Sequence, residues 1–126
     1  MNNLMNPKYP EGRNLFQDKN ILITAAAGSG IGFSTAKRFL EEGANIFISD
    51  VHKGRLDEAI DALRNLNLGK VNGCLCNVTN DEEIEAMFKD ALSCYSNLNG
   101  VINNAGLGGE SLLENMSNEA WDLVMN

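Results

Sequence analysis

Apolar and polar positions follow two different periods along this chain. Short apolar runs rich in β-branched residues, such as Asn20-Ile-Leu-Ile-Thr24 and Asn45-Ile-Phe-Ile-Ser49, are typical of strands that are buried on both faces. The segments between these runs repeat apolar residues every three or four positions, as amphipathic helices do. The pattern therefore predicts strands and helices that alternate along the sequence.

The same pattern fixes where we expect each element. The expected strands cover residues 20–24, 45–49, 71–78 and 100–104. Three helices are expected from three apolar stripes: Ile31, Thr35, Phe39 and Leu40; Leu56, Ile60, Leu63 and Leu66; Ile84, Met87, Phe88 and Leu92. Thr79 or Asn80 can cap the third helix, and Ser117 can cap a last helix that carries Trp121. Strands joined by helices pair in parallel through right-handed crossovers, so the expected fold class is a doubly wound α/β sheet.

A glycine-containing turn follows the first expected strand, at the end of a sheet where ligands bind in such folds. Its candidate residues are Gly28, Ser29, Gly30, Ile31 and Gly32. Glycines let the backbone approach a pyrophosphate, whose charge is stabilised by free N–H groups at the start of the next helix. The alternative is a turn that holds glycines for geometry alone, and the G-x-G-x-G spacing differs from the common G-x-G-x-x-G.

Asp50 ends the second expected strand, about 20 residues beyond the glycines. An acidic side chain there accepts hydrogen bonds from ribose hydroxyls and repels a 2′-phosphate, while the alternative is a surface Asp that opens a turn. Lys53 and Arg55 follow closely and in principle favour NADP. Because Asp50 occupies the discriminating position, we expect NAD rather than NADP.

Composition narrows the classes of protein and partner. The 126 residues suit one small domain or a piece of a larger one. Seventeen acidic and ten basic residues give a formal net charge of −7, which repels nucleic acids and anionic membranes, so neither is an expected partner. The three cysteines form neither a C-x-x-C pair nor a zinc spacing, so we expect no metal and a reducing, cytoplasmic setting. The polar residues 1–18 lack a signal-peptide stretch and are expected to form a flexible arm.

Five short motifs in order give the chain a resemblance to a known family. They are Gly30-Ile31-Gly32, Asp50, Asn77-Val78-Thr79, Asn103-Asn104-Ala105-Gly106 and Trp121-Asp122. Together they resemble the N-terminal half of a short-chain dehydrogenase/reductase (SDR), a family of NAD(P)-dependent oxidoreductases with a Rossmann-type fold. The TAAAG-x-GIG form of the turn, with N-N-A-G-L-G-G later, resembles a bacterial branch linked to steroid breakdown and oxoacyl thioesters. Residues 19–126 would then be the N-terminal part of an incomplete domain.

The resemblance also implies a role for each motif. The glycine turn would hold the pyrophosphate, Asp50 the adenosine ribose, and Asn77 and Val78 the adenine. The asparagines of N-N-A-G would tie down the central sheet, and the backbone after them would line the nicotinamide ribose. The implied cofactor-binding residues are Gly28, Ser29, Gly30, Ile31, Gly32, Asp50, Asn77, Val78, Asn104, Ala105 and Gly106.

The chain departs from the family pattern in three ways. An alanine stands where T-G-x-x-x-G-x-G has its first glycine, and one extra residue lies between Thr24 and Gly30. Asn77 replaces the usual Asp, so it can bind adenine only as a neutral amide. The family's catalytic Asn, Ser, Tyr and Lys are expected beyond Asn126, and neither Tyr9 nor Tyr95 has the Lys that follows four positions later. No catalytic residue is therefore assigned in this chain.

The resemblance implies hydride transfer between nicotinamide and a secondary alcohol or ketone, with alcohol, ketone and acyl-thioester substrates all open. A homo-oligomer is expected for the full-length protein. A dinucleotide-binding module without catalysis, or a truncated relic, is the alternative that the missing catalytic residues suggest. A plain interaction domain of similar architecture is a third alternative, in which the glycine turn and Asp50 would be accidental.

Overall fold

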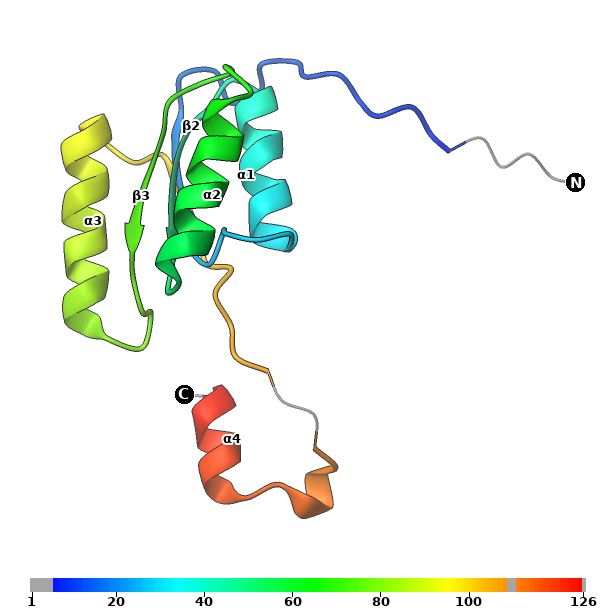
Figure 1. The fold of residues 1–126 in the computed structure, drawn as a ribbon, viewed down its shortest axis with the longest axis vertical. Coiled ribbons are helices and arrows are strands. Elements are labelled where there is room, and N and C mark those ends of the chain that lie inside the picture. Colours follow the sequence, from blue (N-terminus) through cyan, green and yellow to red (C-terminus); the bar gives the residue numbers. More distant parts are fainter. Residues whose placement is uncertain (1–5, 109–110, 126) are drawn as a thin grey trace, which may run out of the picture.

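Strands and helices alternate along the chain in the computed structural model, which describes residues 6–108 and 111–125 (Figure 1). The strands are β1 (Asn20–Ile23), β2 (Asn45–Asp50), β3 (Val71–Leu75) and β4 (Gly100–Ile102). The helices are α1 (Ile31–Glu41), α2 (Lys53–Arg64), α3 (Asp81–Tyr95), the short 3₁₀ turn η1 (Leu113–Asn115) and α4 (Asn118–Met125). Within the described residues, none of these helices combines the length and the apolar character needed to cross a membrane.

The strands form one parallel sheet in the order β3-β2-β1-β4. Figure 1 shows α1 and α2 on one side of this sheet and α3 on the other. The order runs outward from β1 in both directions, because the chain moves from β1 to β2 and β3 and then returns to pair β4 with β1. The predicted doubly wound α/β class is confirmed.

The centre of the sheet, formed by β1 and β2, is buried on both faces. Alternate side chains of a strand point to opposite faces, so Ile21 and Ile23 pack with α1 and α2 while Leu22 packs with α3. Phe47 of β2 joins Leu22 on the α3 side and is fully buried. This explains why these strands read as continuous apolar runs rather than as alternating ones.

Three expected strands end earlier in the structure than the sequence predicts: β1 by one residue, at Ile23, and β3 and β4 by more. β3 stops at Leu75 instead of residue 78, because the Asn77 side chain turns the chain by accepting from the backbone N–H and the hydroxyl of Thr79. β4 stops at Ile102 instead of residue 104, because the N–H of Asn104 donates to the Thr24 side chain rather than to a strand. Side-chain hydrogen bonds therefore set the boundaries of β3 and β4.

The apolar stripe expected for α1 is rotated in the structure. Ile31 is 80% exposed, and the buried positions are Gly32, Ala36 and Leu40. The small residues Gly32 and Ala36 let α1 lie close to the sheet, and this close approach selects the buried face instead of the largest side chains. Trp121 of α4 is 45% exposed.

Tyr95 joins α3 to the sheet. Its hydroxyl donates to the carbonyl of Ile46 at 2.6 Å and accepts from the side-chain amide of Asn72 at 3.2 Å. Burial raises the pKa of Tyr95 to about 12, so the phenol stays protonated near neutral pH. Its ring also meets Phe47 edge to face. These contacts give Tyr95 a structural role.

Glu42, just after α1, anchors the segment that precedes β1. Its carboxylate is buried and accepts the backbone N–H groups of Arg13 at 2.7 Å and Leu15 at 3.2 Å, and it pairs with Arg38. The Arg13 hydrogen bond, then those of Leu15 and Arg38, lower the pKa of Glu42 against the opposing effect of burial. The carboxylate thereby fixes residues 13–15 to the end of α1.

We predict that Glu42 makes the stability of the fold depend on pH in the acid range. Its folded pKa lies below the ordinary value of 4.5, so its contribution is present above that ordinary value and is lost as the pH falls through the folded pKa. Urea unfolding midpoints measured from about pH 7 to about pH 3 should fall more steeply for the wild type than for Glu42→Gln.

The matched control is Glu85→Gln, because Glu85 is an exposed carboxylate that pairs only loosely with Lys89 at 3.9 Å. This variant should follow the wild-type pH profile. Parallel profiles for the wild type and Glu42→Gln would show that Glu42 is not the titrating anchor.

Candidate functional site

The residues assigned from the sequence lie where the four parallel strands end. The glycine turn follows β1, Asp50 closes β2, and the other two segments follow β3 and β4. Parallel strands end at one edge of a sheet, and this edge is where doubly wound folds bind their ligands. Gly32 and Asp50 are buried and Asn104 and Ala105 half-buried, whereas the other assigned residues are exposed: Gly28, Ser29, Gly30, Ile31, Asn77, Val78 and Gly106.

Thr24 and Asn104 lock the turn after β1 to the turn after β4. The buried Thr24 hydroxyl accepts the backbone N–H groups of Asn104 and Ala105, each at 3.0 Å. In return, the side-chain amide of Asn104 donates to the carbonyls of Thr24 and Ala25, each at 3.1 Å. These four hydrogen bonds, the Thr24 joint, tie the end of β1 to the end of β4. Thr24 is a site residue that the sequence did not lead us to assign. The sequence feature that could have identified Thr24 is a hydroxyl side chain directly after an apolar strand.

Ala25 takes the backbone conformation that a glycine would adopt at this point of the turn. Its φ is 50°, in the left-handed region, where a Cβ costs about 1–2 kcal/mol. Gly28 also has a positive φ, of 86°, and a Cβ there would meet no atom within 4 Å. The alanine therefore preserves the bend of the turn, and the open space in front of Gly28 lets a ligand approach the backbone.

The N-terminus of α1 is free to bind an anion. Gly30 precedes the helix without a side-chain hydrogen bond to the first turn, and that turn holds no acidic residue. A Cβ at Gly30 would also meet nothing within 4 Å. Unpaired N–H groups and the positive end of the helix dipole stabilise a phosphate at such a position. The backbone of the turn thus fits a pyrophosphate group.

The N-terminus of α3 shows the opposite chemistry. The side chain of Asn80 accepts the N–H groups of Glu82 and Glu83, so Asn80 rather than Thr79 is the cap among the two that the sequence allows. Three acidic residues, Asp81 to Glu83, occupy the first turn. These side chains already satisfy the helix start and repel phosphate. Of these two helix starts, the one at the glycine turn is suited to a phosphate.

Asp50 presents a buried carboxylate at the end of β2. Its side chain is 6% exposed, and Oδ1 accepts the backbone N–H of His52 at 2.9 Å. Arg55 approaches the same oxygen, with Nη2 at 3.4 Å. Within the described part of the chain, the hydrogen bonds to this carboxylate all go to Oδ1. Oδ2 is therefore the oxygen available to ligand hydroxyl groups.

A hollow of about 500 Å³ brings the segments after β3 and β4 together. It is lined by Asn77, Val78, Thr79, Asp81, Ala25, Ala105, Gly106, Leu107, Asp122, Leu123 and Val124. The side-chain oxygen Oδ1 of Asn77 accepts two hydrogen bonds from Thr79, so the side-chain NH₂ of Asn77 is the group left for a ligand. Leu123 and Val124 of α4 were not assigned from the sequence, although the adjoining Trp121-Asp122 motif marks their helix.

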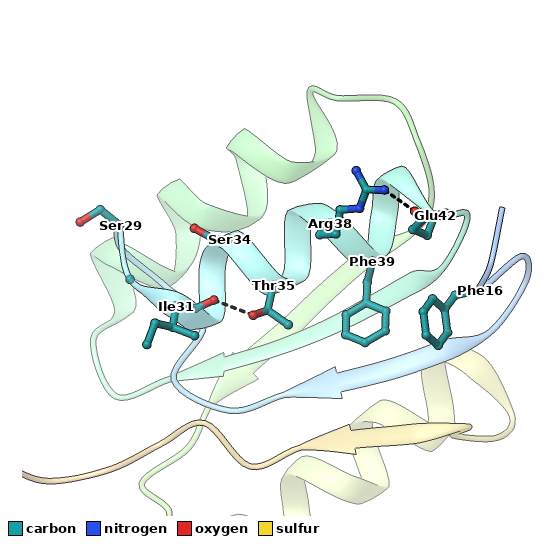
Figure 2. Close-up of a pocket in the computed structure, with 9 residues that line it drawn as sticks. Phe16, Ser29, Ile31, Ser34, Thr35, Arg38, Phe39 and Glu42 are labelled. Atoms are coloured by element: carbon teal, nitrogen blue, oxygen red, sulfur yellow. Dashed lines mark hydrogen bonds and ion pairs between the residues drawn. The ribbon is translucent and has the colours of Figure 1, made fainter. Parts of the chain in front are cut away.

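Ile31 points away from these residues into a larger hollow of about 660 Å³ on the outer side of α1. Figure 2 shows Ile31, Thr35 and Phe39 following one another along the helix, with Phe16 beyond them. The glycine turn borders one end of this hollow through Ser29, and Arg38 paired with Glu42 borders the other. The hollow therefore touches the candidate site only at the turn.

Comparison with known proteins places the chain in a family. The family described as short chain dehydrogenase matches residues 19–126. The chain belongs to the short-chain dehydrogenase family. A curated relative from Mycobacterium tuberculosis, (5R,7aS)-5-hydroxy-7a-methyl-1-oxo-2,3,5,6,7,7a-hexahydro-1H-indene-carboxyl-CoA reductase, is 40% identical over 126 residues, which are 100% of this chain and 48% of the relative. A 3-oxoacyl-[acyl-carrier-protein] reductase from Thermotoga maritima is 36% identical over 87% of this chain and 44% of its own length.

Solved structures of the short-chain dehydrogenase family share the fold. One from Mycobacterium smegmatis is 44% identical with a TM-score of 0.90, over 94% of this chain and 49% of that structure. A Burkholderia phymatum member in complex with NAD is 31% identical, with a TM-score of 0.79 over 86% and 38% of the two chains. An actinorhodin polyketide ketoreductase with NADPH is 29% identical, with a TM-score of 0.78 over 84% and 40%. The chain thus spans about half the length of its curated relatives, and family members bind either nicotinamide cofactor.

We predict that adding a methyl group destabilises the fold at one glycine of this turn and leaves it unchanged at another. A Cβ at Gly32 would lie 2.6 Å from the side-chain amide of Asn104 and 2.8 Å from the carbonyl of Ala25, so Gly32→Ala should destabilise the fold by about 1–3 kcal/mol. A Cβ at Gly30 would meet nothing within 4 Å, so Gly30→Ala should have the same urea unfolding midpoint as the wild type. Equal unfolding midpoints for the two variants would refute the close approach of α1 to Asn104.

Proposed function

We propose that this chain is the cofactor-binding half of an NAD-dependent short-chain dehydrogenase. The full-length enzyme would transfer a hydride between nicotinamide and a secondary alcohol or ketone. The observation that carries this proposal is the uncapped N-terminus of α1 behind an open glycine turn, at the same sheet edge as the buried Asp50 carboxylate. These groups match the pyrophosphate and the ribose of a dinucleotide.

The phosphate-binding part would consist of the glycine turn. Gly28, Ser29 and Gly30 offer exposed backbone, and the Ser29 hydroxyl adds a donor. Ile31 and Gly32 would contribute N–H groups of the first helical turn. Because these donors belong to the backbone, they bind phosphate without requiring a basic side chain.

The adenosine part would lie between the ends of β2 and β3. The free oxygen of Asp50 would accept the ribose hydroxyl groups, and its negative charge would disfavour a 2′-phosphate, so NAD is the preferred cofactor. The Asn77 amide and the half-exposed Val78 side chain would contact the adenine. Val78 is 38% exposed, which leaves an apolar surface for a base.

The nicotinamide part would lie at the end of β4, where Asn104 fixes the backbone and Ala105 and Gly106 line the 500 Å³ hollow. The nicotinamide ring would give a hydride to a ketone substrate or accept one from an alcohol substrate. The residues that would hold or move the substrate proton are expected in the part of the relatives that this chain does not span. Residues 19–126 would be the N-terminal part of that domain, preceded by the arm of residues 1–18.

For the substrate, we propose the ketone or secondary alcohol of an acyl thioester. Two relatives support this class, since one is named as an indene-carboxyl-CoA reductase and another as a 3-oxoacyl-[acyl-carrier-protein] reductase. We also propose that the full-length protein is cytoplasmic and that it forms a homo-oligomer. Within the described residues the cysteines are free, and burial raises the pKa of the Cys74 thiol to about 11, so this thiol is neutral near neutral pH.

We predict that the full-length protein binds NADH and that Asp50 carries much of the selectivity for it. In a fluorescence titration, Asp50→Asn should weaken NADH binding by about tenfold, because a neutral amide accepts more weakly than a carboxylate. The same change should affect NADPH less, since a repulsive charge is removed.

The matched control is Asp57→Asn, because Asp57 is an exposed carboxylate of α2 that pairs with Lys53. This variant should bind both cofactors as the wild type does. A wild-type protein that gives no saturable signal with NADH would overturn the proposed function. Saturable binding without turnover of any ketone or alcohol would favour the non-catalytic binding module instead.

A further inference from the structure

Asp50 carries a positively charged neighbour before any ligand arrives. The guanidinium of Arg55 lies 3.4 Å from Oδ1 of Asp50, and the backbone N–H of His52 donates to the same oxygen at 2.9 Å. The Asp50 side chain is 6% exposed and that of Arg55 is 54% exposed. A buried carboxylate is thus partly neutralised by a cation whose head group still reaches solvent.

Arg55 also borders the glycine turn. A hollow of about 390 Å³ is lined by Arg55 together with Gly28 and Ser29, and Glu58 lines the hollow as well. Arg55 stands in the first turn of α2, which has no side-chain cap and no acidic residue. One exposed guanidinium therefore lies between the proposed ribose-binding carboxylate and the proposed phosphate-binding turn, at the positive end of a helix dipole.

Lys53 is the other cation at the start of α2, and it is engaged elsewhere. Its Nζ pairs with Asp57 at 2.5 Å, one turn along the exposed side of the helix. Within the described residues, the ion pair to the Asp50 carboxylate comes from Arg55. Arg55 also has further donors, because a guanidinium has five N–H groups and, among the described residues, its hydrogen bond to Asp50 uses Nη2.

We propose that Arg55 is a specificity-determining residue that limits the preference for NADH over NADPH. This inference rests on the proposed function. With NADH, Arg55 stays paired with Asp50 while the other carboxylate oxygen accepts the ribose hydroxyl groups. With NADPH, the guanidinium turns to the 2′-phosphate, for which its planar fork is suited. The repulsion between Asp50 and the phosphate is thereby offset, and the enzyme accepts both cofactors.

The test compares four dissociation constants in the full-length protein. NADH and NADPH are titrated by fluorescence, and ADP and 2′,5′-ADP are titrated by competition, so that the 2′-phosphate is the only difference within each pair. For Arg55→Ala we expect weakening of about tenfold or more for NADPH and 2′,5′-ADP, and of less than about threefold for NADH and ADP. Arg55→Lys should restore part of the loss, because the charge remains without the fork.

Lys53→Ala is the matched control, since it removes a nearby charge that is paired with Asp57. It should leave the ratio of the NADPH and NADH constants within about twofold of the wild type. Equal weakening of both cofactors by Arg55→Ala, or an unchanged ratio, would overturn the role of Arg55 while leaving the proposed function standing. Failure of the wild type to bind any of the four probes would overturn the proposed function and this inference with it.

Discussion

The hydrogen bonds between Thr24 and Asn104 hold together the two halves of the ligand-binding edge. One buried hydroxyl accepts two backbone N–H groups from the segment after β4, and one amide returns two hydrogen bonds to the segment after β1. A buried donor that loses its partner costs about 1–3 kcal/mol. The glycine turn after β1 and the segment after β4 keep their relative positions because both are held by these hydrogen bonds of the Thr24 joint.

The phosphate site is formed by backbone groups in an acidic protein. With a formal net charge of −7, the chain repels anions at long range. The uncapped start of α1 supplies local N–H donors, whereas Asn80 and the acidic first turn of α3 disfavour a phosphate at the start of α3. Capping thus excludes the start of α3 but not that of α2, which also lacks a side-chain cap, so the glycine turn after β1 marks the start of α1 as the phosphate site.

The sequence predicts the fold well and the finer geometry of the site only in part. The apolar runs predict the four parallel strands, and the cap residues Ser117 and either Thr79 or Asn80 are predicted too, because these signals are local. The prediction that Ile31 lies on the buried face of α1 is wrong, because the spacing of apolar residues does not show which face of the helix packs against the sheet. The Thr24 joint and the pair of Asp50 with Arg55 depend on contacts that spacing alone does not specify.

The most direct test of this account is the affinity of the full-length protein for NADH when the Thr24 hydroxyl is removed. Thr24→Val keeps the shape of the side chain and leaves two backbone N–H groups without their acceptor, whereas Thr24→Ser keeps the acceptor. We predict binding at least about tenfold weaker for Thr24→Val and within about threefold of the wild type for Thr24→Ser. Equal affinities for the two variants would contradict the dependence of the site on this joint.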